Sequence, residues 1–208
     1  RSYYAVHCPE DLASKDAGSD RVALEEYFLL LSAFRLVKGG REDVRVHKYT
    51  VTAGDVKEFS YRFGFEFTDG QKKAVNEIFA GVNAPSPMNR LLQGDVGSGK
   101  TMVALLSMLL ALDNGYQACM MAPTEILAMQ HYRTLSRLLS DMPVRVALLT
   151  GSTRGPQRRQ LLEDLRTGQV DILVGTHALI EETVVFARLG LAVIDEQHRF
   201  GVEQRSKL

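Results

Sequence analysis

The sequence has no surplus of charge, few cysteines and no hydrophobic run long enough to cross a membrane. Lys plus Arg and Asp plus Glu number 25 each, and this balance neither indicates nor excludes a nucleic-acid partner, because a neutral protein can carry a local basic face. Cys8 and Cys119 have no zinc-site spacing, so we expect a reduced, cytoplasmic protein. The longest apolar stretch, Met102–Leu112, falls well short of the about 20 residues of a membrane helix, and we expect no membrane partner.

The sequence also lacks an initiator methionine, an apolar signal segment behind Arg1 and any stop-like feature before Leu208. We therefore expect a piece excised from a longer protein. With 208 residues, 45% hydrophobic and 24% charged, the chain can form one sizeable folded domain and an additional segment.

The pattern of the sequence changes near residue 65. Residues 1–19 are polar and rich in turn-forming residues. From Asp20 onward, apolar residues at helical spacing predict an amphipathic helix capped by Asp20 and ended by Gly39 and Gly40. We expect residues 1–64 to be a mostly helical lead-in, and residues 65–208 to form the main domain.

Helical segments alternate with short apolar segments after residue 65, which predicts an α/β fold with a parallel sheet flanked by helices. We expect helices over 69–83, 99–114, 125–140 and 156–168, and strands over 88–93, 117–122, 145–149, 171–174 and 191–194. Ligands bind at the carboxyl ends of strands in such sheets. Motifs that follow the strands should therefore share one edge.

A glycine-rich motif follows the first predicted strand and opens a helix. It fits G-x-x-x-x-G-K-[ST] and consists of Gly94, Asp95, Val96, Gly97, Ser98, Gly99, Lys100 and Thr101. Glycines let the backbone N–H groups turn toward phosphate oxygens, and the helix N-terminus adds favourable partial positive charge. Lys100 would reach the β- and γ-phosphates and Thr101 would hold Mg²⁺. The alternative is a glycine-rich turn without a ligand.

Two acidic residues, Asp195 and Glu196, follow the last predicted strand. Mg²⁺ prefers one or two carboxylates together with phosphate oxygens and water, so Asp195 suits the metal. Glu196 suits the task of polarising an attacking water. The alternative is that both residues belong to a surface helix N-terminus, where acidic residues are common without any ligand.

The phosphate loop and the segment Asp195-Glu196-Gln197-His198 together resemble the superfamily-two helicases and translocases, and the stretch from Asp195 to Arg205 resembles their RecG branch. The resemblance implies a RecA-like P-loop NTPase lobe that uses ATP and Mg²⁺, with Lys100 and Glu196 catalytic. It also implies that Gln197 and His198 couple the nucleotide state to bound DNA. The segment from Arg21 to Leu30 resembles the helix that precedes the motor in that branch.

A further resemblance concerns Gln71, which stands where the family has the Q-motif glutamine that reads adenine. Phe67 departs conservatively from the leucine usual at its position in the RecG branch, and Thr68 fits a helix N-cap.

Three motifs that follow strands resemble helicase motifs Ia, Ib and Ic. Their residues are Pro123, Thr124, Thr150, Gly151, Ser152, Thr176 and His177. The resemblance implies contacts with DNA phosphates that do not read the bases. Ordinary strand–helix turns have a similar composition, so that alternative stays open.

Four arginines lie on or near the helix predicted over 156–168: Arg154, Arg158, Arg159 and Arg166. They could steer DNA or belong to a solvated helix face.

Nothing in the sequence resembles a second RecA-like lobe or a wedge domain, which the resemblance implies as partners within a longer bacterial, nucleoid-associated protein. We expect the chain alone to hydrolyse ATP slowly. Two alternatives remain: the motor lobe of a transcription–repair coupling factor, or a nucleotide-switched DNA-binding module.

Overall fold

The computed structural model describes residues 6–8, 11–39, 49–50, 63–64, 66–84 and 87–196. The chain divides into two compact units, Arg1–Arg45 and Val46–Leu208. The division at residue 65 stays a prediction.

The first unit contains the helix α2, Leu12–Gly39. The backbone N–H of Ser14 donates to Asp11 Oδ1 at 2.7 Å, and the N–H of Asp11 donates to Ser14 Oγ at 3.2 Å. This reciprocal cap starts the helix well before Asp20, so the predicted start was wrong, because a satisfied cap outweighs the polar composition of residues 12–19. The predicted end at Gly39 is confirmed.

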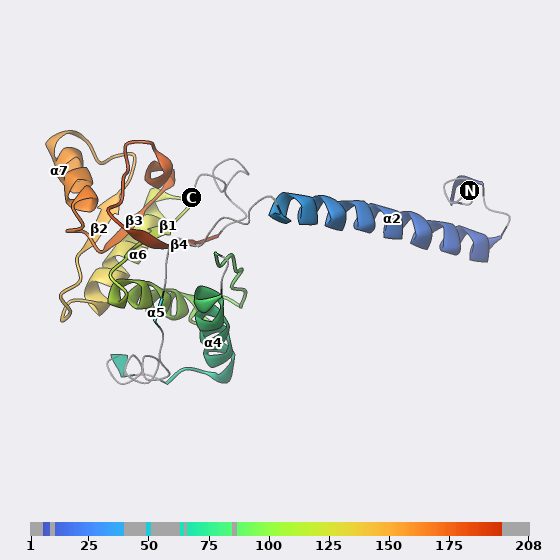
Figure 1. The fold of residues 1–208 in the computed structure, drawn as a ribbon, viewed down its shortest axis with the longest axis horizontal. Helices are drawn as coiled ribbons and strands as arrows, with labels where there is room; N and C mark the ends of the chain where they lie inside the picture. The colour runs from blue at the N-terminus through green and yellow to red at the C-terminus, as the bar shows by residue number, and fades with distance from the viewer. Residues whose placement is uncertain are drawn as a thin grey trace. The chain divides into compact units, whose positions relative to one another are not determined.

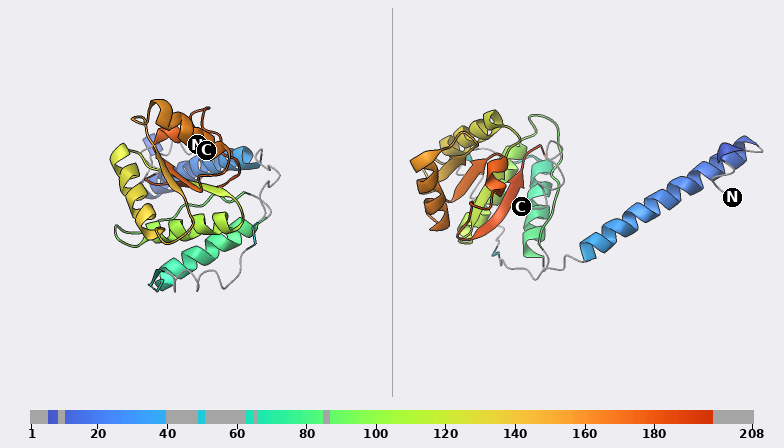
Figure 2. Two further views of the ribbon diagram at one scale, coloured as in Figure 1. Left: turned by 90° about the vertical axis from the view of Figure 1, so that its left-hand side faces the viewer. Right: turned by 90° about the horizontal axis from the view of Figure 1, so that it is seen from above.

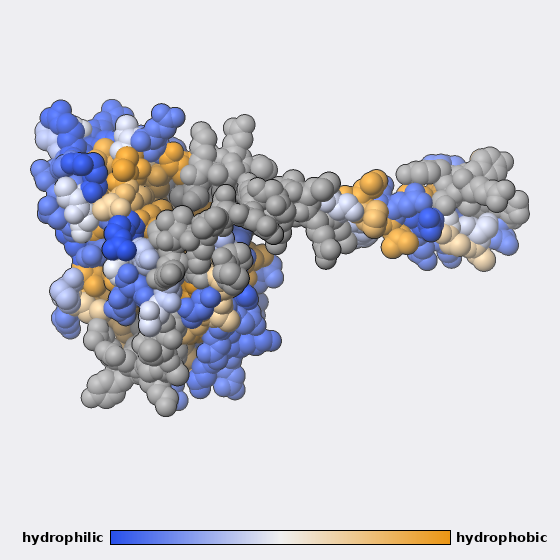
Figure 3. Space-filling view, viewed as in Figure 1, coloured by the Kyte–Doolittle hydropathy of each residue, from blue (hydrophilic) through white to orange (hydrophobic). Residues whose placement is uncertain are grey.

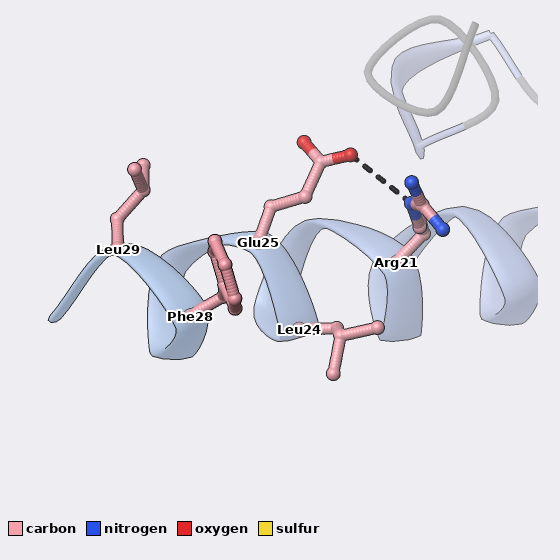
Figure 4. A pocket seen from close by; sticks show the side chains of 5 residues that line it. All are labelled: Arg21, Leu24, Glu25, Phe28 and Leu29. Atoms are coloured by element: carbon pink, nitrogen blue, oxygen red, sulfur yellow. Dashed lines mark hydrogen bonds and ion pairs between the residues drawn. The ribbon is translucent and has the colours of Figure 1, made fainter. Parts of the chain in front are cut away.

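Apolar side chains of α2 are exposed within this unit (Figure 3). Leu24, Phe28 and Leu29 have exposed fractions of 61%, 69% and 68%. They lie beside an ion pair in which Arg21 Nε donates to Glu25 Oε1 at 3.0 Å (Figure 4). No described helix, α2 included, combines the length and the apolar character needed to cross a membrane.

The second unit alternates helices with strands, as predicted. Its elements are α4 (Asp69–Asn83), α5 (Lys100–Asp113), β1 (Gln117–Met121), α6 (Glu125–Leu138), β2 (Val146–Leu149), α7 (Gly155–Arg166), β3 (Ile172–Gly175), the 3-10 helix η1 (His177–Ile180) and β4 (Leu189–Ile194). The strands form one parallel sheet in the order β2-β3-β1-β4 (Figure 1). The predicted α/β class is confirmed.

Helices cover both faces of this sheet (Figure 2). On one face, side chains of β1 and β3 such as Met120 and Val174 pack with buried residues of α4, α5 and α6. On the other face, their neighbours Met121 and Leu173 pack with α7 and η1. Alternate residues of each strand thus enter opposite cores, because successive side chains point to opposite faces.

The predicted strand over 88–93 is absent, because residues 87–95 pair with no strand in the described part of the chain. Leu91 is 65% exposed, whereas Met88 and Leu92 pack partly against the core. An apolar run predicts extended backbone, but a strand also requires a neighbour that accepts its hydrogen bonds. The segment therefore leads into α5 as irregular backbone.

The carboxyl ends of the four strands are level with one another. Leu149 of β2 pairs with Gly175 of β3, Gly175 pairs with Met121 of β1, and Met121 pairs with Ile194 of β4. The residues that come next in the chain therefore lie along one edge of the sheet, which we call the strand-end edge.

The helix α5 brings the phosphate loop to this same edge. It packs against β1 and β4, and a short turn through Gly115 and Tyr116 connects it to β1. Since the turn reverses the chain, α5 runs antiparallel to β1, and its first residue, Lys100, lies toward the strand-end edge.

Candidate functional site

The glycine-rich loop that precedes α5 has the backbone conformation of a phosphate cradle. Gly97 has φ +82° and Gly99, the N-cap of α5, has φ +80°. L-residues rarely adopt this left-handed region, so glycine is required for the backbone to turn there. No side chain caps the start of α5, and the N–H groups of a helix's first turn favour an anion there.

The loop itself holds the Lys100 ammonium. Nζ donates to the backbone oxygens of Gly94 and Asp95, each at 2.7 Å. A phosphate bound in the loop would offer Nζ charged acceptors instead, and hydrogen bonds to charged oxygens are the stronger ones. The position of Lys100 therefore suits the predicted role.

Gln71 joins the start of α4 to the phosphate loop. The N–H of Thr68 donates to Gln71 Oε1 at 2.9 Å, and the N–H of Gln71 donates to Thr68 Oγ1 at 3.3 Å. These reciprocal bonds confirm Thr68 as the N-cap of α4. Gln71 Nε2 donates to the backbone oxygen of Ser98 at 2.9 Å. The structure thus places Gln71 beside the loop with both ends of its amide bonded to backbone, and the reading of adenine stays a prediction.

The acidic pair follows β4 at the strand-end edge. The backbone N–H of Asp195 donates to the Met121 carbonyl at 2.8 Å, which extends the β1–β4 ladder by one residue. Asp195 Oδ1 accepts from the Glu196 N–H at 3.0 Å, and Oδ2 lies 2.7 Å from His131 Nε2. Glu196 has φ +46°. Gln197 and His198 lie outside the described residues.

These residues fit a magnesium ion that a nucleotide helps to hold. The described part of the chain contains no group of three His, Cys, Asp or Glu residues that could bind a metal alone. Mg²⁺ keeps several waters and takes one or two carboxylates together with phosphate oxygens. One carboxylate, Asp195, and the partly buried Thr101 at the start of α5 match that requirement.

The predicted DNA contacts lie along the rest of the strand-end edge, after β2, β3 and β1. Gly151, Ser152, Thr124 and His177 are exposed, and Pro123 is partly buried. Thr150 and Thr176 lie beneath the surface, with exposed fractions of 4% and 2%. Thr150 Oγ1 lies 2.7 Å from Ser152 Oγ, so Thr150 supports an exposed neighbour.

Two residues of this edge escaped the sequence analysis. Both carboxylate oxygens of Glu125 bind Ser152: Oε1 accepts from its N–H and Oε2 from its hydroxyl, each at 3.1 Å. The second is His131, the partner of Asp195. The two contacts span 27 and 64 positions of the chain, so no local spacing could indicate them.

The arginines near α7 are partly neutralised. Arg158 pairs with Glu181 at 2.7 Å and Arg166 with Glu163 at 2.7 Å. The hydrogen bond from Arg166 lowers the pKa of Glu163. Arg154 and Arg159 are exposed. Arg158 and Arg166 thus have acidic partners within the fold, and DNA steering by these four arginines stays a hypothesis.

Comparisons with known proteins agree on one family. The model of the DEAD/DEAH box helicase family matches residues 68–208. The chain is 48% identical over 204 residues to the ATP-dependent DNA helicase RecG of Synechocystis and 44% identical over 207 residues to that of Thermotoga maritima. The two alignments cover 98% and 100% of this chain, but only 24% and 26% of the length of the relatives.

Solved structures agree with this result. A structure of RecG bound to a three-way DNA junction matches 96% of this chain and 27% of that protein, with a TM-score of 0.86 and 42% identity. A hypothetical ATP-dependent RNA helicase from Sulfolobus tokodaii, at 22% identity and a TM-score of 0.51, shares the fold. The chain thus spans about a quarter of the length of the RecG proteins that it matches.

Proposed function

The chain belongs to the DEAD/DEAH box helicase family, and we propose that it is the ATP-binding, RecA-like lobe of an ATP-dependent DNA helicase of the RecG type. In this proposal the chain is one part of a longer motor. A second RecA-like lobe completes the nucleotide site, and a wedge domain takes part in binding branched DNA.

The observation that carries the proposal is that the phosphate loop and the acidic pair reach the same edge of one parallel sheet. Lys100 would offset the charge of the β- and γ-phosphates, while the Thr101 hydroxyl and Asp195 would hold Mg²⁺. The bound ion would neutralise charge that develops on the phosphates. Glu196 would orient and polarise the attacking water, and Gln71 would contact the adenine.

The remainder of the strand-end edge supports binding of a DNA strand. Exposed hydroxyls and backbone groups at Thr124, Gly151 and Ser152 suit phosphate oxygens and carry no information about base sequence. The RecG structure that resembles this chain is described as bound to a three-way DNA junction. We therefore propose that the whole protein remodels branched DNA and stalled forks during repair and recombination, in the bacterial cytoplasm at the nucleoid.

The test compares ATP hydrolysis by the 208-residue chain with that by the full-length protein, each with Mg²⁺ and with or without branched DNA. An arginine supplied by the second lobe is worth roughly 10³–10⁵ in turnover, so the chain alone should be slow and insensitive to DNA. The full-length protein should be strongly stimulated. Fast, DNA-stimulated turnover by the chain alone would contradict the two-lobe proposal.

A substitution identifies the catalytic group. Glu196→Gln in the full-length protein should preserve ATP binding and abolish turnover, because an amide cannot accept the proton of the attacking water. Turnover that survives this change would remove Glu196 from the mechanism.

A further inference from the structure

The carboxylate of Asp195 is held by a residue of another element. His131 lies on α6, and its Nε2 is 2.7 Å from Asp195 Oδ2. The His131 side chain is 15% exposed and that of Asp195 is 34% exposed. An ionised carboxylate only accepts hydrogen bonds, so in a bond to such a carboxylate Nε2 is the donor.

This bond fixes the carboxylate without using up its capacity. Oδ2 receives Nε2–H of His131 and Oδ1 receives the N–H of Glu196 at 3.0 Å. Each oxygen keeps a further lone pair that can face a cation. Hydrogen bonds to a ligating carboxylate orient it, and their loss typically costs about 10–100-fold in metal affinity.

The same helix carries a proposed DNA contact at its N-terminus, about two turns before His131. Thr124 caps α6 by accepting from the Leu127 N–H at 3.3 Å, and Glu125 in its first turn binds the loop that holds Ser152. Thr124 and His131 are about 10 Å apart along the helix axis, at 1.5 Å per residue. A rigid element of two turns thus joins the strand-binding side of the edge to the metal side.

We propose that His131 is a positioning residue for Asp195, and that α6 transmits the binding of a DNA strand at Thr124 and Ser152 to the magnesium ligand through this bond. The inference rests on the proposed function, because it takes Asp195 as a metal ligand and the start of α6 as a strand contact. A displacement of α6 along its axis moves the imidazole and with it the carboxylate, so the affinity for the metal depends on bound DNA.

The experiment measures the affinity of the full-length protein for Mn²⁺ by electron paramagnetic resonance, with a non-hydrolysable ATP analogue and with or without branched DNA. His131→Leu removes the donor at similar volume, and His131→Gln keeps an N–H donor. Arg133→Leu is the matched control, because Arg133 is exposed and lies roughly 200° around the helix from His131. Metal-free affinity for the analogue and thermal unfolding verify that each variant is folded.

We expect His131→Leu to weaken Mn²⁺ binding about 10–100-fold, His131→Gln to recover most of that loss, and Arg133→Leu to match the wild type. DNA should strengthen Mn²⁺ binding by the wild type about 5-fold or more, and His131→Leu should remove this effect.

Unchanged Mn²⁺ affinity in His131→Leu, or equal losses in the Leu and Gln variants, would overturn the positioning role. An undiminished DNA effect in His131→Leu would overturn the link through α6. Failure of the wild type to bind Mn²⁺ with the analogue would instead overturn the proposed function.

Discussion

Replacing Gly99 by alanine should destabilise the second unit by about 2–5 kcal/mol. Two costs add. Gly99 has φ +80°, and an L-residue in that region costs about 1–2 kcal/mol. An added Cβ would also overlap with Gln71 Nε2, so the amide would lose its bonds to Ser98 and Thr68, each worth about 0.5–1.5 kcal/mol.

Gly97 provides the matched control. Its φ is +82°, but an added Cβ would meet no atom within 4 Å, so Gly97→Ala should show the backbone cost alone. The assay is urea unfolding of the nucleotide-free protein followed by circular dichroism, with the free energy extrapolated to water. In a Gln71→Ala background, Gly99→Ala should cost no more than Gly97→Ala. Equal effects of the two glycine substitutions in the wild-type background would refute the overlap with Gln71.

Four further predictions concern single side chains. Lys100→Ala should weaken ATP binding in a calorimetric titration, and an unchanged affinity would contradict the phosphate site. Gln71→Ala should reduce the ratio of ATP to GTP affinity; an intact ratio would remove the amide from the base site. Burial raises the pKa of Cys119 to about 12, so in the native protein a thiol reagent near pH 8 should modify exposed Cys8 and spare Cys119, as mass spectrometry would show. A hydrogen bond from the Gln160 amide holds the pKa of Asp164 below its usual 3.8. The stabilisation that the ionised Asp164 provides is therefore complete above pH 3.8 and is lost as the pH falls through the lower pKa of the folded state. The free energy of unfolding of Asp164→Asn should decline less in acid than that of the wild type.

The sequence was sufficient to predict most helices and strands of the second unit, because the apolar pattern that marks each of them lies within its own segment. The residues of β1 are all buried, and those of β3 likewise, so continuous apolar runs marked both strands. The prediction was wrong where partners outside the segment decide the outcome. Residues 88–93 are apolar enough for a strand but pair with none, and α2 begins at a cap formed by Asp11 and Ser14 in a segment that its composition marked as a loop.

The candidate site divides in the same way. Residues of the phosphate loop and the acidic pair stand in contiguous motifs, and the topology brings both to one edge. The contacts of His131 with Asp195 and of Glu125 with Ser152 depend on β1 lying between β3 and β4 and on the level strand ends. The spacing of residues along the chain does not indicate the strand order, so neither His131 nor Glu125 could be assigned a role from the sequence.

The strand order also determines when the site can form during synthesis. The ribosome makes the phosphate loop before any strand of the sheet and Asp195 after all of them. Until Leu189–Ile194 emerges, β1 is an edge strand, and its Ala118 to Met121 backbone, later paired with that segment, has no partner on that side. A nascent chain that stalls there presents an unpaired apolar edge of the kind that aggregates. Pairing of β1 with the last strand therefore covers this apolar edge and, in the same step, brings Asp195 to the strand-end edge.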